Sequence, residues 1–274
     1  MKDWTDALVN QLYATWVITV KSTKRSVFRK RCLILLAICL LPVLAAILWR
    51  VLAPPGRHGP TAYQMYASLM VTSFLQFLVP IVPLFLGTAA INDEIEEKTL
   101  MFLFLRPVSK FIVVFAKTLS VMVSSVVILG GTAVLIFCIC ASHPEAAMIP
   151  SHLPLLTKDL GVFALASFAY GSLFLLMGVL FRRPHIPGLI FVFAWDEYAA
   201  YLPGKAGILN IKHYVTSIFP HAADMESPLA ILAYHTPEEP LISVIVLIAM
   251  GVGFSFLAFQ VFRNKDYGFE KAAA

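Results

Sequence analysis

A dense group of charged residues, from Asp93 to Lys110, lies between two long apolar stretches of the chain. The stretch before it, 58–92, holds no Asp, Glu, Lys or Arg, and the stretch after it, 111–140, holds only Lys117. A helix needs about 20 apolar residues to cross a bilayer, so both stretches are long enough to span one. The charged group must then form a loop at one membrane face, where its carboxylates can pair with Arg and Lys side chains of a partner protein.

The charged group also carries helix signals. Asp93 and Glu96 have the capping-box spacing, which predicts a short helix over 93–105. The Arg106-Pro107 pair ends this helix, because a residue that precedes proline is disfavoured in helical geometry. The apolar run 100–105 must be buried against the membrane surface, neighbouring helices or a partner. We interpret the segment as a docking helix.

Two further acidic residues, Asp196 and Glu197, lie within an apolar stretch. A charge at the middle of a membrane costs on the order of 3 kcal/mol, so it usually faces a cavity or a partner, which favours a place on a transport pathway. The alternative is that both carboxylates lie near the outer end of a short span, in salt bridges with Lys205 or Lys212. Lys117 is a third intramembrane charge, close enough to the cytoplasmic end of its span for its ammonium to reach the interface.

The sequence lacks the common catalytic motifs. It contains no G-x-x-x-x-G-K-[ST] phosphate loop, no H-E-x-x-H and no G-x-S-x-G, so we expect neither ATP hydrolysis nor a bound cofactor in this chain. Most of the seven histidines fall on the predicted outer side, but none of them has the H-x-x-x-H spacing of a metal site. We therefore predict no metal site. The four cysteines lie in predicted spans and are expected to pack between helices.

The composition is that of an integral membrane protein. Hydrophobic residues make up 59% of the chain, charged residues 14%, and the mean hydropathy is +0.81, whereas a typical soluble domain is roughly 25% charged. We predict an all-α integral membrane protein with six transmembrane helices, at 32–52, 63–91, 111–141, 160–181, 186–202 and 241–262. The fifth is the shortest, and it leads into an outer segment, 203–240, that is too apolar for a free loop.

The distribution of Lys and Arg predicts the orientation. Most of the 21 basic residues lie before the first span, in the second-to-third loop, at Arg182-Arg183 or in the tail, and basic loops stay cytoplasmic. Both termini are therefore expected in the cytoplasm, and the net charge of +5 requires no nucleic acid. Residues 1–30 have the periodicity of an amphipathic helix lying in the inner interface, 31–263 form the membrane domain, and 264–274 form a cytoplasmic tail.

Several of these residues carry a resemblance to a known family. They are an acidic cluster after the second span, then Glu96, Thr99, Leu100, the run Arg106-Pro107-Val108-Ser109-Lys110, and Lys117. In this pattern, in the six spans and in the N-terminal helix, the chain resembles the membrane subunits of type-2 ATP-binding-cassette (ABC) exporters. An acidic residue after a Trp in the fifth span fits as well. Here Trp195 precedes Asp196-Glu197, where many relatives have a single Glu.

The resemblance implies a permease that works as a dimer with two separate ATP-binding subunits, which would hold ATP and Mg²⁺. The second-to-third loop would be a cytoplasmic coupling helix that fits a cleft in the ATPase, and 203–240 would form re-entrant helices on the outer side. The expected partners are thus the ATPase, a second permease copy and membrane lipid. The residues expected to contact the ATPase are Asp93, Glu94, Glu96, Glu97, Lys98, Thr99, Arg106 and Lys110.

Two other functions compete with the exporter. A membrane scaffold or receptor subunit would have no turnover. An intramembrane enzyme would need paired catalytic residues at membrane depth, and only Asp196 and Glu197 are candidates. The exporter interpretation accounts for the docking helix, and export direction and cell-membrane localisation follow from the family resemblance.

Overall fold

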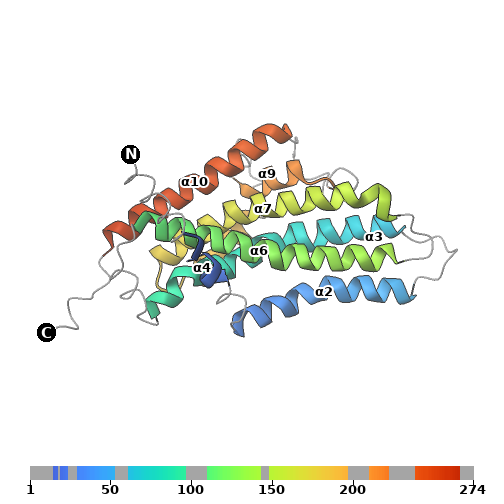
Figure 1. Cartoon of the computed structure of the whole chain (residues 1–274), viewed down its shortest axis with the longest axis horizontal. Helices are drawn as coiled ribbons and strands as arrows, with labels where there is room; N and C mark the ends of the chain where they lie inside the picture. Colours follow the sequence, from blue (N-terminus) through green and yellow to red (C-terminus); the bar gives the residue numbers. More distant parts are fainter. Residues whose placement is uncertain are drawn as a thin grey trace, which may run out of the picture.

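The computed structural model describes residues 15–17, 19–23, 30–52, 61–96, 110–142, 148–196, 210–221 and 238–265, and every regular element in these ranges is a helix. They form an elongated bundle whose long helices run along one common direction (Figure 1). The elements are α2 (Lys30–Leu52), α3 (Ala62–Leu69), η1 (Met70–Leu78), α4 (Val79–Glu96), α6 (Lys110–Ala141), α7 (Met148–Leu180), α8 (His185–Ile190), η2 (Phe191–Asp196), α9 (Ile211–Ile218) and α10 (Pro240–Asn264).

Five helical stretches in the described residues are long and apolar enough to cross a membrane. They are Leu33–Leu52, Ala62–Asp93, Lys110–Ala141, His152–Leu180 and Pro240–Asn264. The predicted span 186–202 corresponds to a shorter apolar helix, His185–Asp196. At 1.5 Å per residue its length is about 18 Å, less than the roughly 30 Å of a bilayer core. The all-helical membrane fold is confirmed, and a full sixth span is not seen in the described residues.

The chain reverses direction at the ends of this bundle. α4, α7 and α10 end on the side where α6 begins, and we call this side the α4 end (Figure 1). α2 and α6 end on the opposite side, where α3 and α7 begin, and we call it the α3 end. α7 reaches the α4 end, whereas α10 begins beside α9 about half-way along the bundle, so the chain between Leu180 and Pro240 passes back along the bundle.

A helical piece before α2 packs against α6 at the α4 end. The Thr19 hydroxyl donates to the Ala116 carbonyl oxygen (3.3 Å), and the Thr23 and Ser120 hydroxyls are 3.1 Å apart. Trp16 in the same piece is 68% exposed, as suits an aromatic side chain at a membrane interface. The amphipathic interfacial helix over 1–30 remains a prediction, since only residues 15–17 and 19–23 of it are described.

α7 lies at the centre of the bundle, against α4, α6 and α10. Its contact with α4 is close because glycines face each other there. A Cβ added to Gly178 would lie 2.9 Å from the Thr88 carbonyl oxygen, and one added to Gly87 would lie 3.0 Å from the Gly171 carbonyl oxygen. Small residues allow such backbone contact between membrane helices. α4 and α7 are thus held together with little room for one to slide on the other.

The second membrane stretch changes helix type before its prolines. η1 is a π-helix and ends directly before α4, in whose first turn Pro80 lies. Proline has no N–H and its ring clashes with the carbonyl four residues earlier, so a locally wider helix in front of it relieves that clash. Pro83 inside α4 and Pro42 inside α2 are tolerated without a change of helix type.

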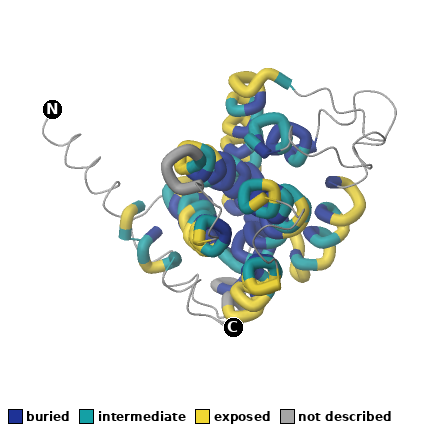
Figure 2. The backbone as a smooth tube through the Cα atoms, turned by 90° about the vertical axis from the view of Figure 1, so that its right-hand side faces the viewer, coloured by how far each residue is buried: buried dark blue, intermediate teal, exposed yellow. Residues whose placement is uncertain are grey.

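The outward faces of the peripheral helices are apolar. In α2 and α10 the most apolar windows are only 28% buried, and Figure 2 shows exposed surface on the outside of a buried centre. Their exposed large hydrophobic side chains include Leu40, Leu44, Leu48, Ile245, Ile248 and Val252. Such faces are stable against hydrocarbon or against another membrane helix.

Two boundaries predicted from the sequence are wrong. No helix starts at Asp93, because α4 runs without a break from Val79 to Glu96. An N-cap requires non-helical backbone before the helix, so Asp93 and Glu96 cannot form a capping box here. The fourth span was also placed too late, since α7 begins at Met148 and its apolar stretch at His152.

Candidate functional site

The predicted docking residues gather at the α4 end. Asp93, Glu94 and Glu96 lie in the last turns of α4, and Lys110 is the first residue of α6. Asp93 is buried at 7% exposure, whereas Lys110 is exposed. The other predicted contacts, Glu97, Lys98, Thr99 and Arg106, lie outside the described residues.

These charges oppose the dipoles of the helices that carry them. A helix C-terminus has a partial negative charge and an N-terminus a partial positive charge. Three carboxylates nevertheless lie at the end of α4, with no basic residue in that turn, and a lysine starts α6. Local helix energetics therefore do not explain this charge pattern.

The α4 end is further fixed by a lysine that caps a neighbouring helix. The Lys265 ammonium donates to the carbonyl oxygens of Val179 and, at 3.3 Å, Leu180, which are left without intrahelical partners at the end of α7. Burial and the nearby Arg182 guanidinium lower the pKa of Lys265. The end of α10 is thus tied to the end of α7.

Lys117 lies about two turns into α6. Its side chain is only 5% exposed, and its ammonium donates to the Ser22 hydroxyl at 3.3 Å. Ser22 belongs to the helical piece that packs on α6. The buried lysine therefore joins that piece to α6.

Asp196 lies in the interior of the bundle, at the end of η2. Its side chain is 2% exposed, and its Oδ2 accepts a hydrogen bond from the Tyr170 hydroxyl at 2.6 Å. Its backbone carbonyl accepts a second one from Asn210 Nδ2 at 2.8 Å. Asn210 in turn caps α9 through Lys212 N–H (3.1 Å). Asp196 is thus a buried carboxylate that anchors the start of α9, while Glu197 lies outside the described residues.

A second buried carboxylate, Asp159 on α7, was not singled out from the sequence. Its Oδ2 accepts from the Tyr66 hydroxyl at 2.8 Å and lies 3.1 Å from His221 Nε2. Asp159 and His221 are fully buried, and Tyr66 is 1% exposed. The predicted span started at 160, so Asp159 was assigned to a loop; a helix boundary one or two turns earlier would have placed it inside the membrane stretch.

Aromatic and imidazole rings surround this carboxylate. The Tyr63 hydroxyl lies 3.4 Å from His221 Nδ1. The centroids of the Tyr63 and His152 rings are 4.7 Å apart. The Tyr66 and His221 rings meet edge to face at 5.3 Å. Within the described ranges, no three His, Cys, Asp or Glu side chains are close enough to hold a metal ion. The group is a hydrogen-bonded network near the α3 end.

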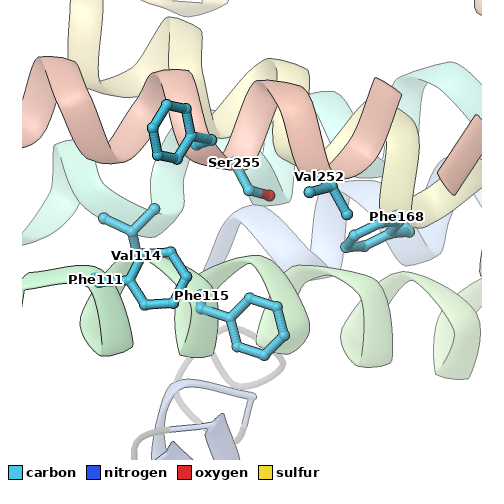
Figure 3. A pocket seen from close by; sticks show the side chains of 7 residues that line it. Phe111, Val114, Phe115, Phe168, Val252 and Ser255 are labelled. Atoms are coloured by element: carbon cyan, nitrogen blue, oxygen red, sulfur yellow. The ribbon is translucent and has the colours of Figure 1, made fainter. Parts of the chain in front are cut away.

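An apolar cavity of about 160 Å³ lies between α6, α7 and α10. Figure 3 shows Phe111, Val114 and Phe115 on α6 opposite Val252 and Ser255 on α10. The only polar group in this lining, the Ser255 hydroxyl, is bonded to Thr118 at 3.4 Å. Such a wall suits hydrocarbon and offers nothing that would hold an ion.

Comparison with known families agrees with the helical architecture and the charged segment. The family profile described as ABC-2 family transporter protein matches residues 23–195, which is more than half of the chain. The chain belongs to this family. It is therefore a multi-pass membrane protein and the permease of an ABC transporter, and it is not the ATPase of that transporter. No individual curated protein matches the sequence.

The match covers the segment from Asp93 to Lys110 and ends one residue before Asp196. The family relation thus applies to α2 through most of η2. α9 and α10 lie beyond the matched residues, and with them His221.

Proposed function

We propose that this permease forms half of an export pathway and is driven by a separate ATP-binding subunit that docks at the α4 end. The main support for this proposal is the group of acidic residues, Asp93, Glu94 and Glu96, in the last turns of α4. Its carboxylates are disfavoured by the helix dipole, and the same holds for Lys110 at the start of α6. A cationic surface on a docked ATPase would compensate the carboxylates.

The structure also supports a route for the motion. α4 continues without interruption into the acidic turn, so a displacement of that turn moves α4 itself. α4 is in backbone contact with α7 at Thr88 and Gly178, and α7 packs on α6 and α10. Closure of an ATPase pair at the α4 end would then move the central helix of the bundle.

The basic residues favour a cytoplasmic α4 end. Lys110 begins α6, Arg182 and Arg183 follow α7, and Arg263 and Lys265 lie at the end of α10, all at the α4 end, whereas Arg50 lies in the last turn of α2 at the α3 end (Figure 1). Excess Lys and Arg marks the cytoplasmic side. Single cysteines at Ser151 and Lys212, in a background without the native cysteines, should react with an impermeant thiol reagent in intact cells. Labelling at Thr23 with none at Ser151 would reverse the orientation.

A second permease copy would complete the pathway. The apolar outer faces of α2 and α10 leave more than one surface available to another membrane helix. We expect native mass spectrometry of the complex to give two permeases and two ATPases. A complex with one permease would contradict this arrangement.

The docking proposal is tested by charge reversal at the acidic turn. Glu96→Lys with Glu97→Lys should weaken copurification of the ATPase or uncouple its ATP hydrolysis, since losing a desolvated interface charge pair costs about 2–5 kcal/mol. The matched control is Glu238→Lys with Glu239→Lys, an adjacent glutamate pair that precedes α10, away from the α4 end. It should leave copurification unchanged. If the first variant binds and stimulates the ATPase like the parent protein, the acidic turn is not the coupling element.

A further inference from the structure

The short helix α9 is held at both of its ends by buried carboxylate residues. At its start, Asn210 Nδ2 donates to the backbone carbonyl of Asp196. Just past its end, His221 Nε2 lies 3.1 Å from Asp159 Oδ2. Each aspartate also accepts a hydrogen bond from a tyrosine, Tyr170 in one case and Tyr66 in the other.

The two attachments differ in one chemical respect. Asn210 is an amide and keeps the same charge at every pH, whereas His221 is the side-chain type that changes charge near neutrality. Asp159 and His221 are both 0% exposed. The second carboxylate oxygen of Asp159, Oδ1, has no hydrogen-bond partner among the described residues, so the ionised carboxylate is incompletely solvated by hydrogen bonds.

We propose that Asp159 and His221 form a proton-binding site whose occupancy controls how firmly α9 is docked on the bundle. With the proton bound, an imidazolium donates from Nε2 to Asp159 and from Nδ1 to the Tyr63 hydroxyl, and the pair is neutral as a whole. When the proton is absent, neutral His221 still donates to Asp159 and accepts from Tyr63, but the negative charge of the Asp159 carboxylate remains buried without a compensating positive charge. An uncompensated buried charge is strongly destabilising, so loss of the proton loosens the end of α9.

Several other ionisable groups lie around His221. Tyr63 and Tyr66 face it from α3, and His152 and Asp159 come from α7. Cys140 of α6 borders Tyr66. α9 itself carries His213 and Tyr214, which lie near Glu238 at the start of α10. Of these, His152 and His213 are the other imidazoles, and burial lowers the pKa of His213, so its charging opposes docking from the acidic side.

The test is hydrogen–deuterium exchange of residues 210–221 in the purified full-length protein, reported as protection factors so that the intrinsic pH dependence of exchange is removed. Between about pH 5 and pH 8, where imidazoles change charge, protection should fall as pH rises. The fall is at most about tenfold per pH unit, because one proton is linked. In the His213→Gln variant, the opposing titration of the His213 imidazole is removed. Protection of residues 210–221 should therefore fall more steeply with rising pH.

Two variants separate this site from a general effect of pH. His221→Gln keeps a neutral donor and should abolish the fall in protection with rising pH, leaving only the opposite dependence that His213 contributes. Asn210→Ala loosens the other attachment and should lower protection at every pH while keeping the slope. The proposal is overturned if protection in His213→Gln stays constant or rises with pH, a result that does not require His221→Gln to fold. It is equally overturned if His221→Gln retains the parent slope.

Discussion

The two tyrosine–aspartate pairs of this bundle use the same chemistry at different positions in the fold. Tyr170 and Asp196 lie inside the bundle where η2 ends, and Tyr66 and Asp159 lie near the α3 end. Each pair has a hydroxyl–carboxylate hydrogen bond of 2.6 or 2.8 Å. The third partner differs, because an asparagine reaches the backbone of Asp196 while a histidine reaches the carboxylate of Asp159.

The two pairs differ in the charge that the third partner can carry. Asp196 combines with neutral donors, an arrangement that fixes the start of α9. Asp159 combines with a group that can carry the opposite charge. Charged groups are costly inside a membrane unless they are paired, and the Asp159 carboxylate lies within reach of a side chain that can pair with it as an imidazolium.

The largest expected effect comes from removing the carboxylates. Asp159→Ala leaves the Tyr66 hydroxyl and His221 Nε2 without their buried acceptor and should lower the free energy of unfolding by about 3–5 kcal/mol. Asp196→Ala leaves the Asn210 bond to the backbone in place and should cost about 1–3 kcal/mol. Equilibrium unfolding in mixed micelles gives both values. An equal or larger loss for Asp196→Ala would remove the distinction between the pairs.

An effect smaller than that of Asp159→Ala, and comparable to that of Asp196→Ala, is expected from the tyrosine hydroxyls. Tyr66→Phe and Tyr170→Phe each remove one donor to a carboxylate and should cost about 1.5–3 kcal/mol, the range for hydrogen bonds to charged groups. Double-mutant cycles with Asp159→Asn and Asp196→Asn measure the coupling within each pair. A coupling near zero in either cycle would mean that the short distance does not represent a stabilising hydrogen bond.

The smallest effect is expected from His213. Burial lowers its pKa below the usual value of 6.5, so the docked state binds fewer protons than the undocked state. Its contribution to α9 docking is therefore present above about pH 6.5 and is lost as the pH falls below it, the opposite sign to that proposed for His221. His213→Gln should flatten the acidic side of the pH–stability curve. A curve that is unchanged by the substitution would assign the acidic side to another group.

Much of the architecture could be predicted from the sequence. Long runs without charge require membrane helices, and five of the six predicted spans correspond to helices of sufficient length. The membership of the ABC-2 family, expected from the charged segment and the Arg106–Lys110 run, is confirmed by the match over 23–195. The proposed ATPase contacts of that segment remain predictions, since part of it lies outside the described residues.

Helix boundaries and side-chain partners could not be predicted in the same way. The capping-box spacing at Asp93 and Glu96 is equally compatible with the last turns of a helix, and α4 continues through both residues because nothing after Pro83 interrupts it. The sequence predicted that Lys117 lies near the cytoplasmic end of its span, but it could not predict that the lysine donates to Ser22 of the N-terminal piece and is buried there.

The sequence by itself determined where the chain is apolar enough to cross a membrane and where its charge gathers, because both depend only on the order of residue types. Only the tertiary structure decided which polar groups meet. Tyr66, Asp159 and His221 are separated by 93 and 62 positions along the chain, and no local periodicity relates them. They come together because α3 and α7 both pack on α6 and α9 packs on α7, which places one carboxylate within reach of both a hydroxyl and an imidazole.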